Sequence, residues 1–407
     1  MRICLGHTNM KSYGCPPFSI WFFSILTVVV MGFAASGATL PMKEPRMTEK
    51  QGREKLAQYA GTWQTREEWE QRARNIRAGI LQGANLSPLP SRCDLKPIIW
   101  GKRACKGYTV ENVAFESLPG FFVTGNLYRP AQGNGPFPGV LCPHGHGNFP
   151  RVAAYTQTRS AVLARMGAVV LAYDMVGMGD STQTPHTDPN VLTFQLWDSI
   201  RALDFLASLP NVDPGRLACT GESGGGTQTF MLAAVDDRLA LSVPVVMVSA
   251  HFFGGCQCES GLPIHHSARH DTANAEMTAL FAPKPLLVIS DGKDWTRNVP
   301  KVEFPYIQSV YKLYGALDQV ENTHLPDEGH DYGPSKREAM YRFMAKHLQL
   351  NLKAVETADG KIDESDTTLD PAALAVFTPE HPRPAYALKD GTEVLNALKS
   401  AQKGLSQ

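Results

Sequence analysis

A serine held between glycines is the clearest chemical signal in the sequence. The run Gly-Glu-Ser-Gly-Gly at 221–225 follows an apolar stretch at 216–220 that predicts a strand, and it opens a stretch at 224–235 that predicts a helix. Side chains at the glycine positions of so sharp a turn would clash, and the turn lifts the serine hydroxyl above the sheet at a helix N-terminus. We therefore interpret Ser223 as a catalytic nucleophile.

A serine hydroxyl needs a base to take its proton and a carboxylate to orient that base. In the chain order typical of this turn, the acid follows a later strand, and the apolar run at 286–290 is such a strand. Asp294, a few residues beyond it, is the predicted acid, and Asp291 is the alternative, with turn stabilisation as its other role. His330, just before a predicted helix that begins at 335, is the predicted base.

Acyl transfer also needs donors for the oxyanion, usually two backbone N–H groups. The amide of Gly224 lies directly after the nucleophile and provides one. The loop His-Gly-His-Gly at 144–147 follows the predicted strand at 137–143, and the amide of His146 is our choice for the second. Trp295, beside the acid, is a candidate substrate-binding residue that either stacks on a sugar ring or packs in the interior.

Cysteines and histidines gather between residues 251 and 270: His251, Cys256, Cys258, His265, His266 and His270. Such density indicates metal binding, but Cys-x-Cys is not the usual zinc spacing and the predicted triad needs no metal. We predict an insertion that shapes the substrate pocket, with no metal and no cofactor. A non-catalytic protein that binds metal through this insertion is the alternative. We expect Cys142 and Cys219 to be buried free thiols on neighbouring strands.

The elements that must position these residues alternate between strands and helices of 12 to 18 residues. This alternation predicts an α/β fold with a mostly parallel central sheet covered by helices on both faces. We expect an N-terminal helical addition with a linker at 39–100, a catalytic domain at 101–352 and a peripheral C-terminal extension at 353–407.

The first 38 residues predict an export signal. An apolar stretch at 18–35 follows Arg2 and Lys11, and small residues precede Thr39, where cleavage is expected. The alternative is a retained membrane anchor. Cleavage predicts a secreted or periplasmic protein with no stable membrane anchor. Lys+Arg and Asp+Glu balance at 39 each, which argues against a nucleic-acid partner.

The motifs together resemble the α/β-hydrolase superfamily, and specifically its dienelactone hydrolase and acetyl xylan esterase-like branch. GNLYRPAQGNGPFPGVLCPHGHG resembles the entry to that fold, and AYDMVGMGDST resembles its loop after the fourth strand. Dienelactone hydrolase itself uses a cysteine, whereas this chain has Ser223. The resemblance implies an ester substrate, often an acylated polysaccharide in exported members. A glucuronoyl methylesterase or a peptidase on the same fold is the rival, although peptidases usually carry a larger accessory domain.

Overall fold

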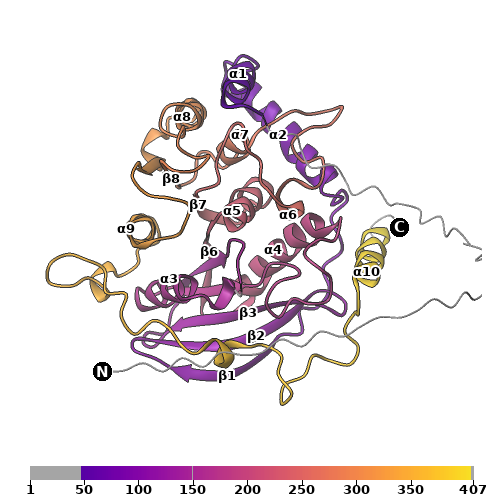
Figure 1. Ribbon diagram of the computed structural model, residues 1–407, viewed down its shortest axis with the longest axis vertical. Helices are drawn as coiled ribbons and strands as arrows, with labels where there is room; N and C mark the ends of the chain where they lie inside the picture. The colour runs from indigo at the N-terminus through magenta and orange to yellow at the C-terminus, as the bar shows by residue number, and fades with distance from the viewer. Residues whose placement is uncertain (1–46, 149, 405–407) are drawn as a thin grey trace, which may run out of the picture. The chain divides into compact units, whose positions relative to one another are not determined.

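The computed structural model describes residues 47–148 and 150–404, so the predicted signal at 1–38 lies outside the described residues (Figure 1). Nine strands form one sheet in the order β1-β2-β3-β5-β4-β6-β7-β8-β9. The pairs β1–β2, β2–β3 and β3–β5 are antiparallel, and all the other neighbouring pairs in this order are parallel. The strands are β1 (Ile98–Ala104), β2 (Tyr108–Leu118), β3 (Phe121–Pro130), β4 (Phe137–Pro143), β5 (Val169–Tyr173), β6 (Val212–Glu222), β7 (Leu239–Val245), β8 (Leu286–Asp291) and β9 (Val320–Leu325).

Helices cover both faces of this sheet, as predicted. On one face of the sheet, a core cluster joins α3 and α9 to strand residues such as Val140. On the other face, a second cluster joins α4, α5 and α8 to the strand residues that alternate with these, such as Leu141. The central strands are buried on both faces and therefore read as continuous apolar runs. The helices are α3 (Ala154–Arg165), α4 (Val191–Ser208), α5 (Gly224–Val235), α6 (Gln257–Ser260), α7 (Asn274–Ala279), α8 (Glu303–Leu313) and α9 (Pro334–Leu348).

The N-terminal addition consists of α1 (Glu49–Ala60) and α2 (Arg66–Gly83), each opened by a threonine capping box. Its apolar side joins the core on the α5 face, with Trp69 almost wholly buried. Arg72 on α2 pairs with Glu276 on α7, with 2.6 Å between Nε and Oε1. The addition is thus part of the folded unit around the sheet.

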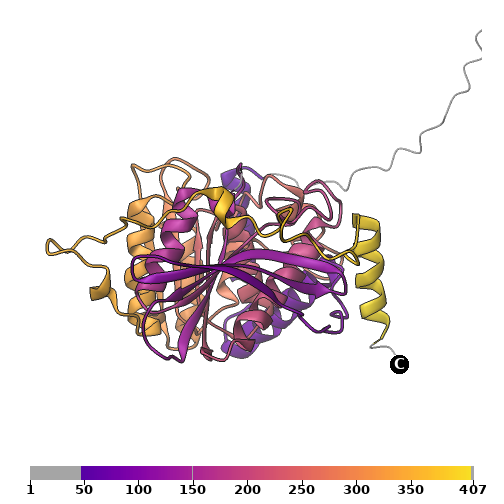
Figure 2. The same ribbon diagram turned by 90° about the horizontal axis from the view of Figure 1, so that it is seen from below.

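The C-terminal extension packs more closely than a peripheral tail would. Leu374 and Val376 are fully buried, and the carbonyl of Leu374 accepts from Nη1 of Arg151 at 3.0 Å. The extension ends in α10 (Gly391–Lys403), whose Val394 and Leu398 are buried. Figure 2 shows α10 beside the twisted strands. These four buried residues lie in two short apolar groups, at 371–377 and 394–401, within a polar stretch whose pattern predicts a peripheral segment.

The sequence did not predict the two edge strands, β1 and β9. β1 contains Gly101 at φ +69 and a shift of register, and β9 is mostly polar. Edge strands bury little and therefore lack the apolar pattern of central ones. No helix among the described residues is long and apolar enough to cross a membrane.

The six cysteines within the described residues are free. Cys142 on β4 and Cys219 on β6 are buried, as predicted, but they belong to the core clusters on opposite faces of the sheet. Their side chains therefore point apart, and a bond between them is excluded by geometry.

Candidate active site

Ser223 lies at a sharp turn between β6 and α5. Its backbone adopts φ +56 and ψ −123, a region that non-glycine residues rarely occupy. A Cβ at Gly221 or Gly225 would come within 2.4 or 2.6 Å of the carbonyl oxygen of Pro143, so both positions require glycine. The turn holds Ser223 at the carboxyl end of the sheet and at the N-terminus of α5.

His330 and Asp294 meet at the same end of the sheet. Nδ1 of His330 lies 2.6 Å from Oδ2 of Asp294, whose other oxygen accepts from the amide and hydroxyl of Thr296 at 2.5 and 2.6 Å. Asp294 is almost fully buried, whereas the imidazole is about one third exposed (31%). The contact fixes Nδ1 as the nitrogen that faces the carboxylate and leaves Nε2 for a substrate or nucleophile.

Asp291, the alternative acid, has a different partner. Its carboxylate is buried and lies 3.4 Å from Nζ of Lys336, which is itself buried. Its other oxygen accepts from the amide of Lys293 at 3.1 Å. Burial and the charge of Asp294 raise the pKa of Asp291. The structure therefore places Asp294, and not Asp291, against His330.

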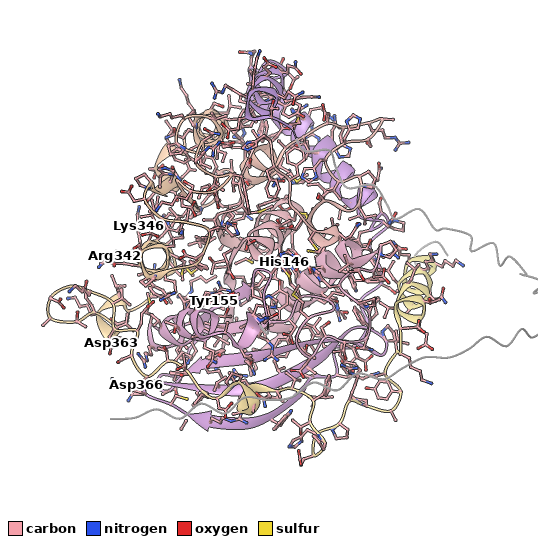
Figure 3. All side chains as sticks on the ribbon, in the orientation of Figure 1. His146, Tyr155, Arg342, Lys346, Asp363 and Asp366 are labelled. Carbon is pink, nitrogen blue, oxygen red and sulfur yellow. The ribbon has the colours of Figure 1, made fainter. Side chains whose placement is uncertain are left out.

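A cleft of about 360 Å³ contains both Ser223 and His330. His146 and Tyr155, labelled in Figure 3, line it as well. The cleft brings together the predicted nucleophile, the predicted base and the predicted oxyanion loop. Its other lining residues are Gly145, Glu222, Asp331, Tyr332, Gly333 and Arg337.

The predicted oxyanion loop is held against the nucleophile turn. A Cβ at Gly145 would lie 3.1 Å from Cβ of Ser223, and one at Gly224 would lie 2.8 Å from Cε1 of His146. The amide of Gly145 donates to Oε1 of Glu222 at 2.8 Å, and Glu222 also pairs with the fully buried Arg159. These contacts hold the loop that carries His146 next to the turn that carries Ser223 and Gly224.

Trp295 packs against the base. Its ring lies 4.4 Å from the His330 ring and 4.3 Å from the Phe252 ring, measured between centroids. The indole is partly buried and does not line the cleft around Ser223. This placement favours packing over stacking on a sugar, the two interpretations that the sequence left open.

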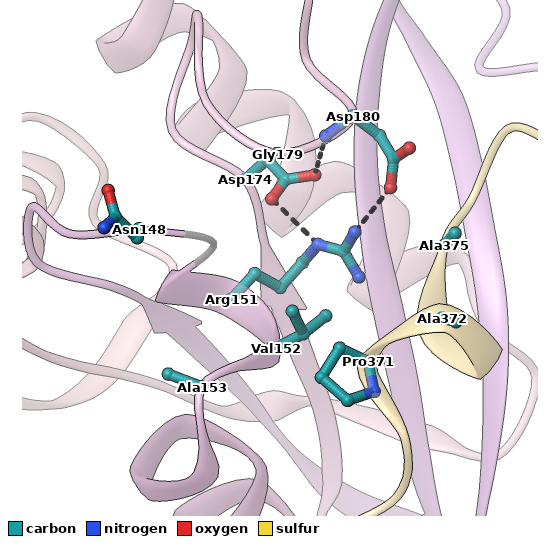
Figure 4. A pocket seen from close by; sticks show the side chains of 10 residues that line it. All are labelled: Asn148, Arg151, Val152, Ala153, Asp174, Gly179, Asp180, Pro371, Ala372 and Ala375. Carbon is teal, nitrogen blue, oxygen red and sulfur yellow. Dashed lines mark hydrogen bonds and ion pairs between the residues drawn. The ribbon is translucent and has the colours of Figure 1, made fainter.

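A larger hollow of about 480 Å³ lies beyond the oxyanion loop and contains none of the predicted catalytic side chains (Figure 4). Arg151 crosses it and forms ion pairs with Asp174 and Asp180, at 2.8 and 2.6 Å. The C-terminal extension closes one side through Pro371 and Ala372. Its charged groups Arg151, Asp174 and Asp180 are therefore engaged with one another.

The insertion at 251–270 divides into two groups. His265 and His270 contact Oδ1 of Asn274 at 2.7 Å and the carbonyl of Ile264 at 2.9 Å, and exposed His266 contacts Asp271. The two cysteines do not meet these histidines. They face His146 and His186, which come from the loops after β4 and β5.

Sequence reasoning missed three residues of the site: Glu222, Arg159 and Tyr155. Glu222 occupies the variable position of the glycine–serine motif. Arg159 and Tyr155 lie on α3, whose sequence has the mixture of polar and apolar residues of an ordinary helix that covers a sheet. A charged residue one position before the nucleophile was the available signal. Its partner could be found only from the packing of α3 on the sheet.

A mostly parallel sheet that carries a strained serine at a strand-to-helix turn defines an α/β-hydrolase. The X-Pro dipeptidyl-peptidase (S15) family matches residues 120–292. YtaP of Bacillus subtilis, which is named as a hydrolase, is 30% identical over 230 residues, 50% of this chain and 75% of that protein. The solved structure of methylesterase BT1017 is 38% identical, with a TM-score of 0.81, and the match covers 89% of this chain and 82% of that chain.

A more distant relative is the 4-O-methyl-glucuronoyl methylesterase of Neurospora crassa, 22% identical over 60% of this chain and 68% of that protein. These relatives are hydrolases and esterases, in agreement with the resemblance noted in the sequence. The chain belongs to the α/β-hydrolase superfamily, in which it is a carboxylic ester hydrolase.

Proposed function

We propose that the protein is an exported serine esterase that hydrolyses esters of carbohydrates through Ser223, His330 and Asp294. The contact of 2.6 Å between His330 and Asp294, at the mouth of the cleft that contains Ser223, carries this proposal. Export follows from the predicted signal at 1–38, and N-terminal sequencing of the exported protein, with Thr39 as the expected first residue, tests it.

The proposed reaction has two halves. Ser223 Oγ attacks the ester carbonyl while Nε2 of His330 takes its proton, and the amides of His146 and Gly224 stabilise the oxyanion. His330 then gives the proton to the leaving alcohol, and an acyl-enzyme remains. Water attacks this intermediate with the same base, releases the acid and restores the serine. Asp294 orients His330 and stabilises its charged form throughout.

Two kinds of ester fit this chemistry, and the relatives favour one of them. An acetyl ester leaves its acyl group on Ser223, whereas a methyl ester of a sugar acid leaves the sugar there and releases methanol. The similarity to methylesterase BT1017 covers most of the chain and supports a methyl ester, and the similarity to the 4-O-methyl-glucuronoyl methylesterase supports a uronate, so we favour a methyl-esterified uronate. Acetylated xylan is the second candidate, which the resemblance in the sequence suggests.

A product assay separates these substrates. Methyl-esterified uronate oligomers and acetylated xylan are incubated with the enzyme, and released methanol and acetate are measured. Methanol from the first substrate, in excess of acetate from the second, supports the favoured assignment. Release of acetate alone would move the substrate to acetylated xylan, and release of neither would remove carbohydrate esters from the proposal.

Ser223→Ala tests the nucleophile. We expect the variant to lose at least about 10³-fold in kcat on p-nitrophenyl acetate, because the remaining groups cannot form the acyl-enzyme. Ser208→Ala, at the exposed end of α4, is the matched control and should keep full activity. A Ser223→Ala enzyme that retained more than a few per cent of activity would rule out this nucleophile.

A further inference from the structure

Four side chains with metal-binding atoms converge beside the active site. They are the imidazoles of His146 and His186 and the thiols of Cys256 and Cys258, and their ligand atoms all lie within 4.8 Å of one another. Nε2 of His146 lies 3.2 Å from both Nε2 of His186 and Sγ of Cys258, and Sγ of Cys256 lies 3.1 Å from Nε2 of His186. Three separate segments contribute these residues, namely the loops after β4 and β5 and the start of α6 with the residue before it, so the convergence comes from the tertiary structure.

The ligand set and its dimensions fit one metal ion. Two thiolates and two imidazoles are the donors of tetrahedral zinc sites, and soft sulfur ligands disfavour Mg²⁺ or Ca²⁺. A zinc ion bound at about 2.3 Å to sulfur and about 2.0 Å to nitrogen keeps its ligand atoms about 3.3–3.8 Å apart. The three separations of 3.1 and 3.2 Å need to open slightly to admit the ion, and the other pairs of ligand atoms, all within 4.8 Å of one another, lie close enough to move onto it.

A hydrogen bond behind the cluster orients one of its ligands, His186. Nδ1 of His186 lies 2.6 Å from the carbonyl oxygen of Val176, which accepts its hydrogen. Nε2 of His186 is then the unprotonated nitrogen, and it faces Cys256 and His146. A metal-bound histidine typically shows this arrangement, with its outer nitrogen bonded to a carbonyl.

The thiol side is fixed in a similar way. The buried carboxylate of Glu259 accepts from the amides of Gly255 and Cys256, at 2.9 and 3.0 Å. Cys258 is fully buried beside it, whereas His146 is exposed. The cluster thus has one buried thiol, Cys258, one partly buried thiol, Cys256, and an open side at His146 through which a metal ion can enter.

We propose that His146, His186, Cys256 and Cys258 bind one Zn²⁺ in a closed, structural site. Four protein ligands leave no position for a substrate or a reactive water, so the ion acts by holding the loops together. This assignment reverses the expectation of no metal in the insertion. Cys-x-Cys supplies only half of the site, and the histidines that complete it lie far away in the sequence.

The site has a direct consequence for the esterase, which rests on the proposed function. The ring of His146 lies over Gly224, and these two residues supply the proposed oxyanion amides. Zinc bound to this ring fixes the loop that carries the second amide. His146 is therefore a positioning residue for the oxyanion hole through its side chain, and it touches substrate only through its backbone.

Metal analysis of the purified full chain tests the site. The protein is produced in zinc-supplemented medium, and zinc, copper, iron and nickel are measured by mass spectrometry. We expect one zinc per chain, and we expect cobalt-exchanged protein to show the visible bands of tetrahedral Co²⁺ with thiolate charge transfer. Ser223→Ala protein should contain the same zinc, so this result is independent of the proposed esterase activity.

Variants locate the ion. Cys258→Ser and His186→Ala should each raise the Kd for zinc by more than about 100-fold. Cys105→Ser and His266→Ala remove a partly exposed thiol and an exposed imidazole outside the cluster, and they should bind zinc as the parent does. If Cys258→Ser fails to fold, His186→Ala and the cobalt spectrum of the parent protein still decide the question.

Four outcomes would overturn the proposal. The first three are zinc-supplemented protein with less than about one tenth of an ion per chain, a disulfide between Cys256 and Cys258 detected by peptide mass, and zinc that remains after His186→Ala. A full complement of copper in place of zinc would also reject the zinc assignment. None of these measurements depends on activity. An inactive protein with one zinc per chain would therefore contradict the proposed function and still support the metal site.

Discussion

At the scale of single residues, two carboxylates three positions apart, one at the end of β8 and one just beyond it, contact different partners. Asp294 faces His330 and is held by Thr296, whereas Asp291 faces the buried Lys336. A carboxylate in a salt bridge to a lysine cannot also orient an imidazole on the other side of the loop. The sequence left this choice open, and the contacts decide which carboxylate meets the histidine.

Paired substitutions test this division. Asp294→Asn should lower kcat by about 10³–10⁴-fold, because the amide no longer fixes the tautomer of His330 or stabilises its charge. Asp291→Asn should leave most of kcat and instead lower the free energy of unfolding by about 1–3 kcal/mol, because Lys336 loses one charged partner. Kinetics on p-nitrophenyl acetate and urea denaturation measure both effects. The reverse order of kcat losses would transfer the role to Asp291.

A residue could be predicted from the sequence where its position follows from nearby strands and helices, and could not where it follows from the tertiary structure. Ser223 and His330 stand at fixed places relative to strands and helices, so the pattern of elements was enough to nominate them, whereas it left Asp291 and Asp294 as alternatives for the acid. His186 lies in an irregular loop between β5 and α4, and nothing in the local sequence links it to Cys256. Those two residues come together only because segments distant in the sequence fold over the same carboxyl end of the sheet.

At the scale of elements, the oxyanion loop at 144–147 is tied to three neighbours. Buried His144 accepts the amide of Met175 at Nε2, at 3.0 Å, and burial lowers the pKa of His144 to about 4, which keeps this nitrogen unprotonated. Arg159 on α3 donates to the carbonyl of Pro143 at 2.9 Å, and Glu222 accepts the amide of Gly145. The parallel core that supports this loop was predictable from apolar periodicity, whereas the edge strands β1 and β9 were not.

The ion pair between Glu222 and Arg159 is buried on both sides. Glu222→Gln alone should lower the free energy of unfolding by about 3–5 kcal/mol, because the fully buried guanidinium loses its counter-charge. Arg159→Met together with Glu222→Gln removes both charges and should cost less than the sum of the single changes, with a coupling of about 2 kcal/mol or more. Urea denaturation of the four proteins measures the coupling. Additivity within about 0.5 kcal/mol would contradict it.

At the scale of the whole molecule, stability should depend on pH through carboxyl groups buried away from the active site. Asp198 on α4 is almost fully buried, and burial raises its pKa to about 7, against the opposing influence of Ser117 and Arg201. The folded protein therefore keeps this proton at pH values where the unfolded chain has lost it. Such a group stabilises the folded state fully below the ordinary pKa of aspartate, and the contribution disappears as the pH rises through about 7.

Asp198→Asn makes this contribution measurable. The amide is neutral at every pH, so the variant should be more stable than the parent at pH 8, by up to about 4 kcal/mol, and should gain clearly less at pH 5. Urea denaturation at the two pH values gives the difference. Asp213→Asn is the matched control, because a hydrogen bond from Arg216 lowers the pKa of this partly exposed carboxylate near the start of β6, and both pH values lie above it. The control should change stability equally at pH 5 and pH 8, and an equal change for Asp198→Asn would mean that its carboxyl group is ionised in the folded protein throughout this range.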